Sequence, residues 1–193
     1  MLSVRGAAAV ALLATAAGLA AGCGGGTRQD AGEPSAAFRV RVVDARFPRY
    51  QGLADNVPLS ITVRNTGTKT IPNVAVTVDG FNDVSTMPGQ ADPQRPVWIV
   101  NIGPVNGVTA YVNTWALGPL AAGRTRTFRW LVTAVKAGTH TLHYRVAAGL
   151  NGKARAVTAA NQPPEGTLVA RVTRRPPLSR VDPVTGKIIT VGQ

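Results

Sequence analysis

The segment that decides the fold runs from Val57 to Arg64 and reads VPLSITVR. Its apolar side chains alternate with polar ones, Val57, Leu59, Ile61 and Val63 against Ser60, Thr62 and Arg64. Because successive side chains of a strand point to opposite faces, this period of two predicts a strand with one buried face and one solvated face.

The same alternation recurs on both sides of this segment, at 38–42, 74–78, 126–133 and 139–146. Less regular strand candidates follow at 97–102, 108–115, 153–157 and 167–173. Beyond the N-terminal segment, no long stretch has the period of an amphipathic helix. The pattern therefore predicts an all-β protein, an antiparallel β-sandwich of seven to nine short strands.

Turn signals lie between these strands. Asn151-Gly152 fits a two-residue turn, and it predicts a hairpin between a strand ending near Gly149 and one beginning at Lys153. Residues 65–68 and 136–138 predict looser turns. The longest expected loop, 83–96, suits either binding or a plain surface connection.

The aromatic residues delimit the folded domain. All ten lie between Phe38 and Tyr144, and aromatic side chains dominate the core of a small domain. We therefore expect the sandwich to span 38–173 and a proline-containing tail to span 174–193, in which 187–191 offers an edge strand.

The N-terminus predicts export. Arg5 precedes an uninterrupted run of apolar or small residues at 7–19, as in a secretory signal of 22 residues. The stretch 19–23, LAAGC, resembles the bacterial lipobox. That resemblance implies that Cys23 becomes the lipidated first residue of a protein anchored to the outer face of the cell membrane. Residues 23–37 then form a lipidated, flexible linker. A simple secretory signal or a buried core cysteine is the alternative.

Three further segments carry a second resemblance: 59–68 (LSITVRNTGT), 117–123 (LGPLAAG) and 138–142 (GTHTL). Together they resemble the bacterial CARDB domains, a cell-adhesion-related immunoglobulin-like family, over about residues 38–148. His140 stands where those domains usually have an aromatic residue. The resemblance implies an immunoglobulin-like sandwich used outside the membrane for binding or spacing, and it implies no catalytic or ligand-binding residue.

Few residues suggest chemistry, and we expect no catalytic residue, metal ion or cofactor. His140 and His143 lie at odd spacing on one strand, so they face opposite sides and cannot chelate one ion. The chain has no Gly-x-Ser-x-Gly motif, calcium loop or phosphate-binding loop. Trp98, Trp115 and Trp130 suit the core, with a sugar-binding platform at Trp98 or Trp115 as a minor alternative.

The net charge of +12 is uneven along the chain. Residues 1–22 carry only Arg5, residues 23–92 carry seven basic and seven acidic residues, and residues 93–193 carry 13 basic residues against Glu165 and Asp182. Export argues against nucleic acid as the partner. We therefore expect Arg129, Arg145 and Arg171 to share one outward face that contacts an anionic envelope component.

These observations favour a lipid-anchored, non-enzymatic module that binds or spaces something at the cell envelope. Its expected partners are the membrane, through Cys23, and an envelope polyanion or a protein; the sequence gives no oligomeric state. Two alternatives stay open. One is an extracytoplasmic chaperone or assembly factor that adds a strand to a free sheet edge, and the other is an unrecognised hydrolase.

Overall fold

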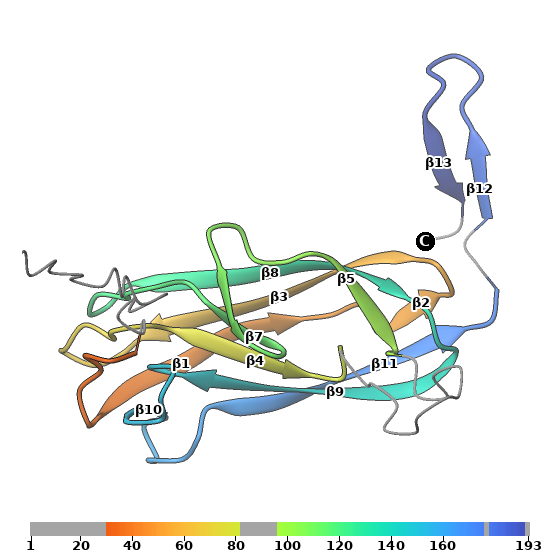
Figure 1. The fold of residues 1–193 in the computed structure, drawn as a ribbon. Coiled ribbons are helices and arrows are strands. Elements are labelled where there is room, and N and C mark those ends of the chain that lie inside the picture. The colour runs from red at the N-terminus through yellow and green to blue at the C-terminus, as the bar shows by residue number, and fades with distance from the viewer. Residues whose placement is uncertain (1–29, 82–95, 176–177, 192–193) are drawn as a thin grey trace, which may run out of the picture.

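The computed structural model describes residues 30–81, 96–175 and 178–191. Every regular element in these ranges is a β-strand, so the predicted all-β class is confirmed. Two sheets pack face to face as a β-sandwich, and a short hairpin follows at the C-terminal end (Figure 1). In the described ranges, no helix is long and apolar enough to cross a membrane.

The first sheet has five strands. Their order is β10 (Ala154–Val157), β1 (Ala36–Arg46), β3 (Asn56–Asn65), β8 (Thr125–Ala134) and β5 (Trp98–Ile102). The segment that the sequence analysis started from lies in β3, at the centre of this sheet, where it pairs antiparallel with β1 and β8. Its predicted alternation holds, because the side chains of the odd-numbered residues Val57 to Val63 are all buried.

The second sheet has six strands. Their order is β2 (Tyr50–Gly52), β11 (Glu165–Thr173), β9 (Gly138–Ala147), β4 (Ala75–Asp79), β7 (Thr114–Ala116) and β6 (Val108–Tyr111). The segment expected as one strand at 108–115 is split into β6 and β7, because Asn113 turns the chain with a φ of 59°. β2 was not predicted, because three residues are too few to show a strand pattern.

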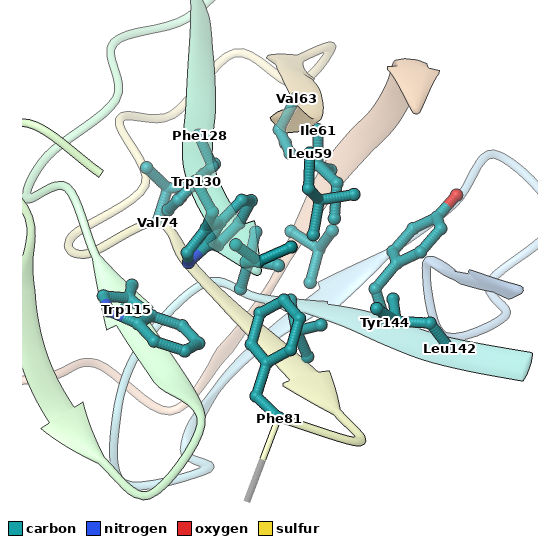
Figure 2. Close-up of a cluster of buried hydrophobic side chains, with 14 of the residues drawn as sticks. Leu59, Ile61, Val63, Val74, Phe81, Trp115, Phe128, Trp130, Leu142 and Tyr144 are labelled. Atoms are coloured by element: carbon teal, nitrogen blue, oxygen red, sulfur yellow. The ribbon is translucent and has the colours of Figure 1, made fainter. Parts of the chain in front are cut away.

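The core lies between the two sheets and contains all three tryptophans. Trp115 from the six-stranded sheet meets Trp130 from the five-stranded sheet edge to face, with ring centroids 5.5 Å apart (Figure 2). Phe128 stacks on Trp130 at 5.9 Å. At the other end of the core, the Trp98 indole nitrogen donates a hydrogen bond of 2.7 Å to the Gln51 side chain. The two sheets are therefore joined by aromatic contacts as well as by aliphatic packing.

The hairpin predicted at Asn151-Gly152 is wrong, and the chain changes sheet at each of the three expected turns. Residues 65–68 lead from β3 to β4, residues 136–138 lead from β8 to β9, and Asn151-Gly152 leads from β9 to β10. In each case the two strands lie in opposite sheets. The local signals do mark chain reversals, but the reversals are arches over the core.

Two strand pairs also depart from the antiparallel expectation. β10 runs parallel to β1, and β2 runs parallel to β11. For β10 the cause is the preceding arch, which brings the chain into the five-stranded sheet at the end where β1 also starts. The two sandwich sheets together contain eleven described strands, more than the seven to nine expected.

The segments flanking the sandwich also differ from expectation. The predicted linker reached residue 37, but Asp30 and Glu33 are buried against the sandwich and β1 begins at Ala36. In the tail, β12 (Leu178–Val181) and β13 (Ile188–Val191) pair with each other, so 187–191 adds no edge strand to the sandwich. Cys23, the signal segment and nearly all of the loop at 83–96 lie outside the described residues.

Candidate anion-binding face

The outer face of the five-stranded sheet collects arginine side chains. On β1, burial of Phe38 and Val40 turns the intervening Arg39 and Arg41 outward. Past a bulge between Val42 and Asp44, Arg46 is exposed on the same strand. The local cause is the Phe-Arg-Val-Arg-Val alternation, which leaves an arginine at each solvated position between Phe38 and Val42.

Three more arginines from neighbouring strands extend this set. Arg64 of β3 lies directly opposite Arg41, Arg129 of β8 lies opposite Ser60 of β3, and Arg155 of β10 lies opposite Ala37 of β1. All three are exposed. We call the set the arginine face; its members are Arg39, Arg41, Arg46, Arg64, Arg129 and Arg155.

Carboxylates compensate little of this charge. Asp44 lies on the same face and pairs with Arg46, with the Arg46 Nε atom 2.9 Å from Asp44 Oδ2. The Arg39 guanidinium donates a hydrogen bond of 3.2 Å to the Ala159 carbonyl oxygen. The other four guanidinium groups have no side-chain hydrogen bond or ion pair within the described ranges. The arginine face therefore carries a concentrated and largely uncompensated positive charge.

The pair Arg41 and Arg64 is the most unusual contact in this set. Directly opposed residues of an antiparallel pair have Cβ atoms about 5 Å apart, and like charges at such positions destabilise the sheet. A polar residue such as threonine at either position would avoid that repulsion. Both positions instead present exposed guanidinium groups, which suit bidentate binding of phosphate or carboxylate.

The three arginines predicted from the sequence do not share a face. Arg129 belongs to the five-stranded sheet, whereas Arg145 and Arg171 lie on β9 and β11 of the six-stranded sheet. Their side chains are exposed on the opposite outer surface of the sandwich. The prediction fails because the connection from β8 to β9 changes sheet, so charges close in sequence are separated by the core.

The outer face of the six-stranded sheet is also less basic than expected. Arg145 lies directly opposite Glu165, and His143 lies directly opposite Asp79. Arg171 lies between Thr139 and Tyr50 on its two neighbouring strands. A cross-strand carboxylate thus lies opposite Arg145 but not opposite Arg171, and the arginine face, with more arginines on one sheet, is the better candidate for contact with anions.

Sequence reasoning missed Arg39, Arg41 and Arg64 because charge was counted along the chain. The acidic residues that balance them in sequence have other positions: Asp30 and Glu33 are buried near the start of the domain, and the Asp55 side chain accepts a hydrogen bond from the backbone of Gly52. The alternation of β1 with arginine at its solvated positions was the available signal.

The structure separates the aromatic and histidine candidates. Trp98 and Trp115 are buried, so the alternative of a sugar-binding platform is wrong. His140 packs edge to face on Trp98, and its Nε2 atom lies 3.0 Å from the Lys136 carbonyl oxygen. His143 is exposed on the opposite face of β9, as the odd spacing predicts. Within the described ranges, no group of three potential metal ligands gathers.

The buried Glu33 carboxylate ties the N-terminal segment to the turn after β9. Glu33 accepts hydrogen bonds from the backbone N–H of Leu150, at 2.7 and 2.8 Å, and of Asn151, at 3.2 Å. The Asn151 side chain in turn donates to the Asp30 carbonyl oxygen at 2.7 Å. Glu33 borders a surface depression that also touches Asn73, Asn106 and Leu117, and it is the one carboxylate among the described residues that line it.

The free sheet edges of the described part are short. β10 and β6 span four residues each, β5 spans five with a bulge against β8, and β2 spans three. Strand addition by a chaperone needs a long row of unpaired backbone groups. None of these four strands provides it, but β10 covers only Ala36–Arg39 of β1, so among the described residues Val40–Arg46 has no strand partner on that side.

Several solved structures have a similar fold. A CARDB domain from Pyrococcus furiosus, in complex with di-metal ions, is 14% identical at a TM-score of 0.45, and the match covers 72% of this chain and 96% of that one. Native alpha-2-macroglobulin from Escherichia coli, from domain MG7 to the C-terminus, is 15% identical at a TM-score of 0.43. That match covers 79% of this chain and 21% of the other. A chain from the complex of zinc 2-glycoprotein and prolactin inducible protein from human seminal plasma is 14% identical at a TM-score of 0.39. That match covers 70% of this chain and 97% of the other.

These likenesses concern the fold alone. A CARDB domain is among the structures that the chain resembles, as it was among the families that its sequence resembles. No protein-family model matches the chain, and no curated protein matches it.

Proposed function

We propose that this chain is an exported, lipid-anchored β-sandwich without catalytic activity, which binds an anionic component of the cell envelope through its arginine face. The observation that carries the proposal is the set of four exposed guanidinium groups that have no side-chain hydrogen bond or ion pair among the described residues, with Arg41 and Arg64 directly opposed. An anionic ligand bound between them removes the repulsion that the isolated domain bears.

The anchoring part of the proposal rests on the sequence. Cys23 ends the LAAGC motif directly after an apolar run, and acyl chains contribute about 0.8 kcal/mol per buried methylene, so two or three chains hold a protein firmly. Cys23→Ser in the full chain is therefore expected to move the protein from the membrane pellet to the soluble fraction. Recovery of this variant in the pellet after a high-salt wash would contradict the anchor.

The binding part is tested with the chain from Gly24 onward, which contains every described strand. Inorganic polyphosphate serves as the probe, titrated at low and high salt. We expect Arg41→Gln combined with Arg64→Gln to weaken binding roughly tenfold, since each charge contact at a surface contributes up to about 1 kcal/mol. High salt is expected to weaken binding by the unsubstituted chain.

A matched control exists on the opposite sheet. Arg145→Gln combined with Arg171→Gln removes the same total charge from exposed strand positions. If net charge alone governs binding, both double variants lose equal affinity, and the proposal of a specific face fails. If the arginine face binds the anion, only the first variant shows the loss.

A further inference from the structure

The arginine face continues into a set of exposed or half-buried apolar residues at its other end. Pro58 of β3 pairs with Leu131 of β8, which pairs with Ile102 of β5, and Ile99, three residues earlier in β5, pairs with Thr133 of β8. Ile99 is 49% exposed and Ile102 is 56% exposed. We call these four residues the apolar edge. One sheet face thus presents arginines at one end and, at the other, aliphatic side chains beside the polar pair Asn56 and Thr133.

The outer face of the other sheet has a different character. Its strands present mainly threonines between the compensated charges, namely Thr77, Thr114, Thr139, Thr141 and Thr167. Thr77 and Thr114 join their hydroxyl groups at 2.8 Å. Val169 and Tyr50 are exposed there as well, and Tyr50 lies directly opposite Arg171. This face is typical of a surface in contact with water.

The N-terminal segment places the arginine face near the start of the described chain. Glu33 and Asn151 fix the segment from Asp30 onward beside β10, and the Ala36 N–H donates to the Lys153 carbonyl oxygen at 3.2 Å. The next residues of the two strands include Arg39 and Arg155. Cys23 precedes Asp30 by seven residues, and a chain of that length spans at most about 25 Å.

We infer that the anionic component is the surface of the bilayer in which Cys23 is anchored, and that the arginine face lies on its phosphate groups with the apolar edge in the headgroup region. The inference rests on the proposed function and names its partner. The short reach from Cys23 keeps this end of the sandwich beside the lipid. A hydrophilic wall polymer would give the exposed isoleucines no favourable environment, whereas a lipid interface does.

Vesicle binding tests the partner, using the chain from Gly24 so that no acyl chain contributes. We expect binding to vesicles of phosphatidylcholine mixed with phosphatidylglycerol and little binding to phosphatidylcholine alone. Arg41→Gln with Arg64→Gln is expected to lower the partition coefficient roughly 30-fold, the effect of two charges near an anionic surface. Ile99→Ser with Ile102→Ser is expected to lower it roughly fivefold, because part of each side chain leaves water on binding.

The control for the isoleucine variant is Val169→Ser with Tyr50→Ser, since these residues are 46% and 70% exposed on the opposite sheet. This variant should bind vesicles as the unsubstituted chain does. Circular dichroism and tryptophan emission in the absence of vesicles verify that each variant is folded. Equal losses in the two serine variants would overturn the assignment of the face.

Orientation can be measured separately, because Cys23 is the only cysteine of the sequence and the chain from Gly24 has none. A cysteine introduced at Ile102 or at Val169 carries an environment-sensitive fluorophore. We expect a blue shift with anionic vesicles at position 102 and none at 169. If polyphosphate binding depends on Arg41 and Arg64 but vesicles are not bound, the proposed function stands and the bilayer is refuted as the partner. If neither probe depends on them, both proposals fail.

Discussion

Replacing Asn65 by alanine tests how the two sheets are held together at one end of the sandwich. Asn65 ends β3 and is fully buried. Its side-chain oxygen accepts a hydrogen bond from the Gly67 N–H at 3.0 Å. Its amide nitrogen donates to the carbonyl oxygens of Lys69 and Leu120, each at 2.9 Å. One side chain therefore ties the arch after β3 to the segment that precedes β8.

The size of the effect follows from these three bonds. Each hydrogen bond contributes a net ~1 kcal/mol, and a buried group left without a partner costs more than an exposed one. The Leu120 carbonyl oxygen keeps its backbone bond from Ile71 at 2.9 Å, which limits the penalty at that atom. Asn65→Ala is therefore expected to lower the free energy of unfolding by about 3 kcal/mol and the melting temperature by roughly 10 °C.

Urea unfolding of the chain from Gly24, followed by tryptophan emission, measures this difference. Asn101→Ala is the matched control, because the Asn101 amide also donates two hydrogen bonds, to Asn56 and Thr133, but at an exposed site where water can replace them. Its expected cost is below about 1 kcal/mol. If the two variants lose equal stability, burial of the Asn65 amide is not what stabilises the arch.

Other substitutions and conditions probe the core and the arginine face. Gly166→Ala places a methyl group against the Tyr144 ring and is expected to cost about 1–3 kcal/mol in thermal unfolding, whereas Gly32→Ala has free space and should cost little. Burial raises the pKa of the Tyr144 phenol above its usual 10.0, so above that pH the unfolded chain loses a proton that the folded chain keeps. Stability should therefore fall with rising pH there, and Tyr144→Phe should remove this contribution in urea titrations. Arg64→Thr should raise stability by about 0.5 kcal/mol at low salt by removing repulsion from Arg41, while anion binding weakens.

The strands themselves were largely predictable, because a sheet with one buried face imposes a period of two on its sequence. β3, β8 and β9 follow this pattern almost residue by residue. β2 and β7 were not predictable as separate strands, since three residues are too few to show a period. Trp98 lies in the irregular strand β5, and the buried partner of its indole, Gln51, is 47 residues away in sequence.

Strand pairing could not be inferred from the same local signals. A turn motif such as Asn151-Gly152 reverses the chain, but whether the flanking strands then pair or pack across the core depends on distant groups. Here those groups are Glu33 and Asp30, which bind the turn from the opposite end of the sequence. The main determinant of this connection lies more than a hundred residues from it.

The distribution of charge over the two sheets could likewise not be inferred from local sequence, and it is the basis for proposing the arginine face as a binding surface. Arginines placed without regard to binding would fall on both sheets alike, together with whatever acids the strands carry. In the folded chain, Glu165 lies directly opposite Arg145 on the neighbouring strand, whereas Arg64 lies directly opposite Arg41. If stability were the only requirement, replacing one arginine of the pair Arg41 and Arg64 would stabilise the sheet. The uncompensated pair is consistent with a ligand that supplies the missing negative charge from outside the protein, and a bilayer beside the N-terminus would supply it.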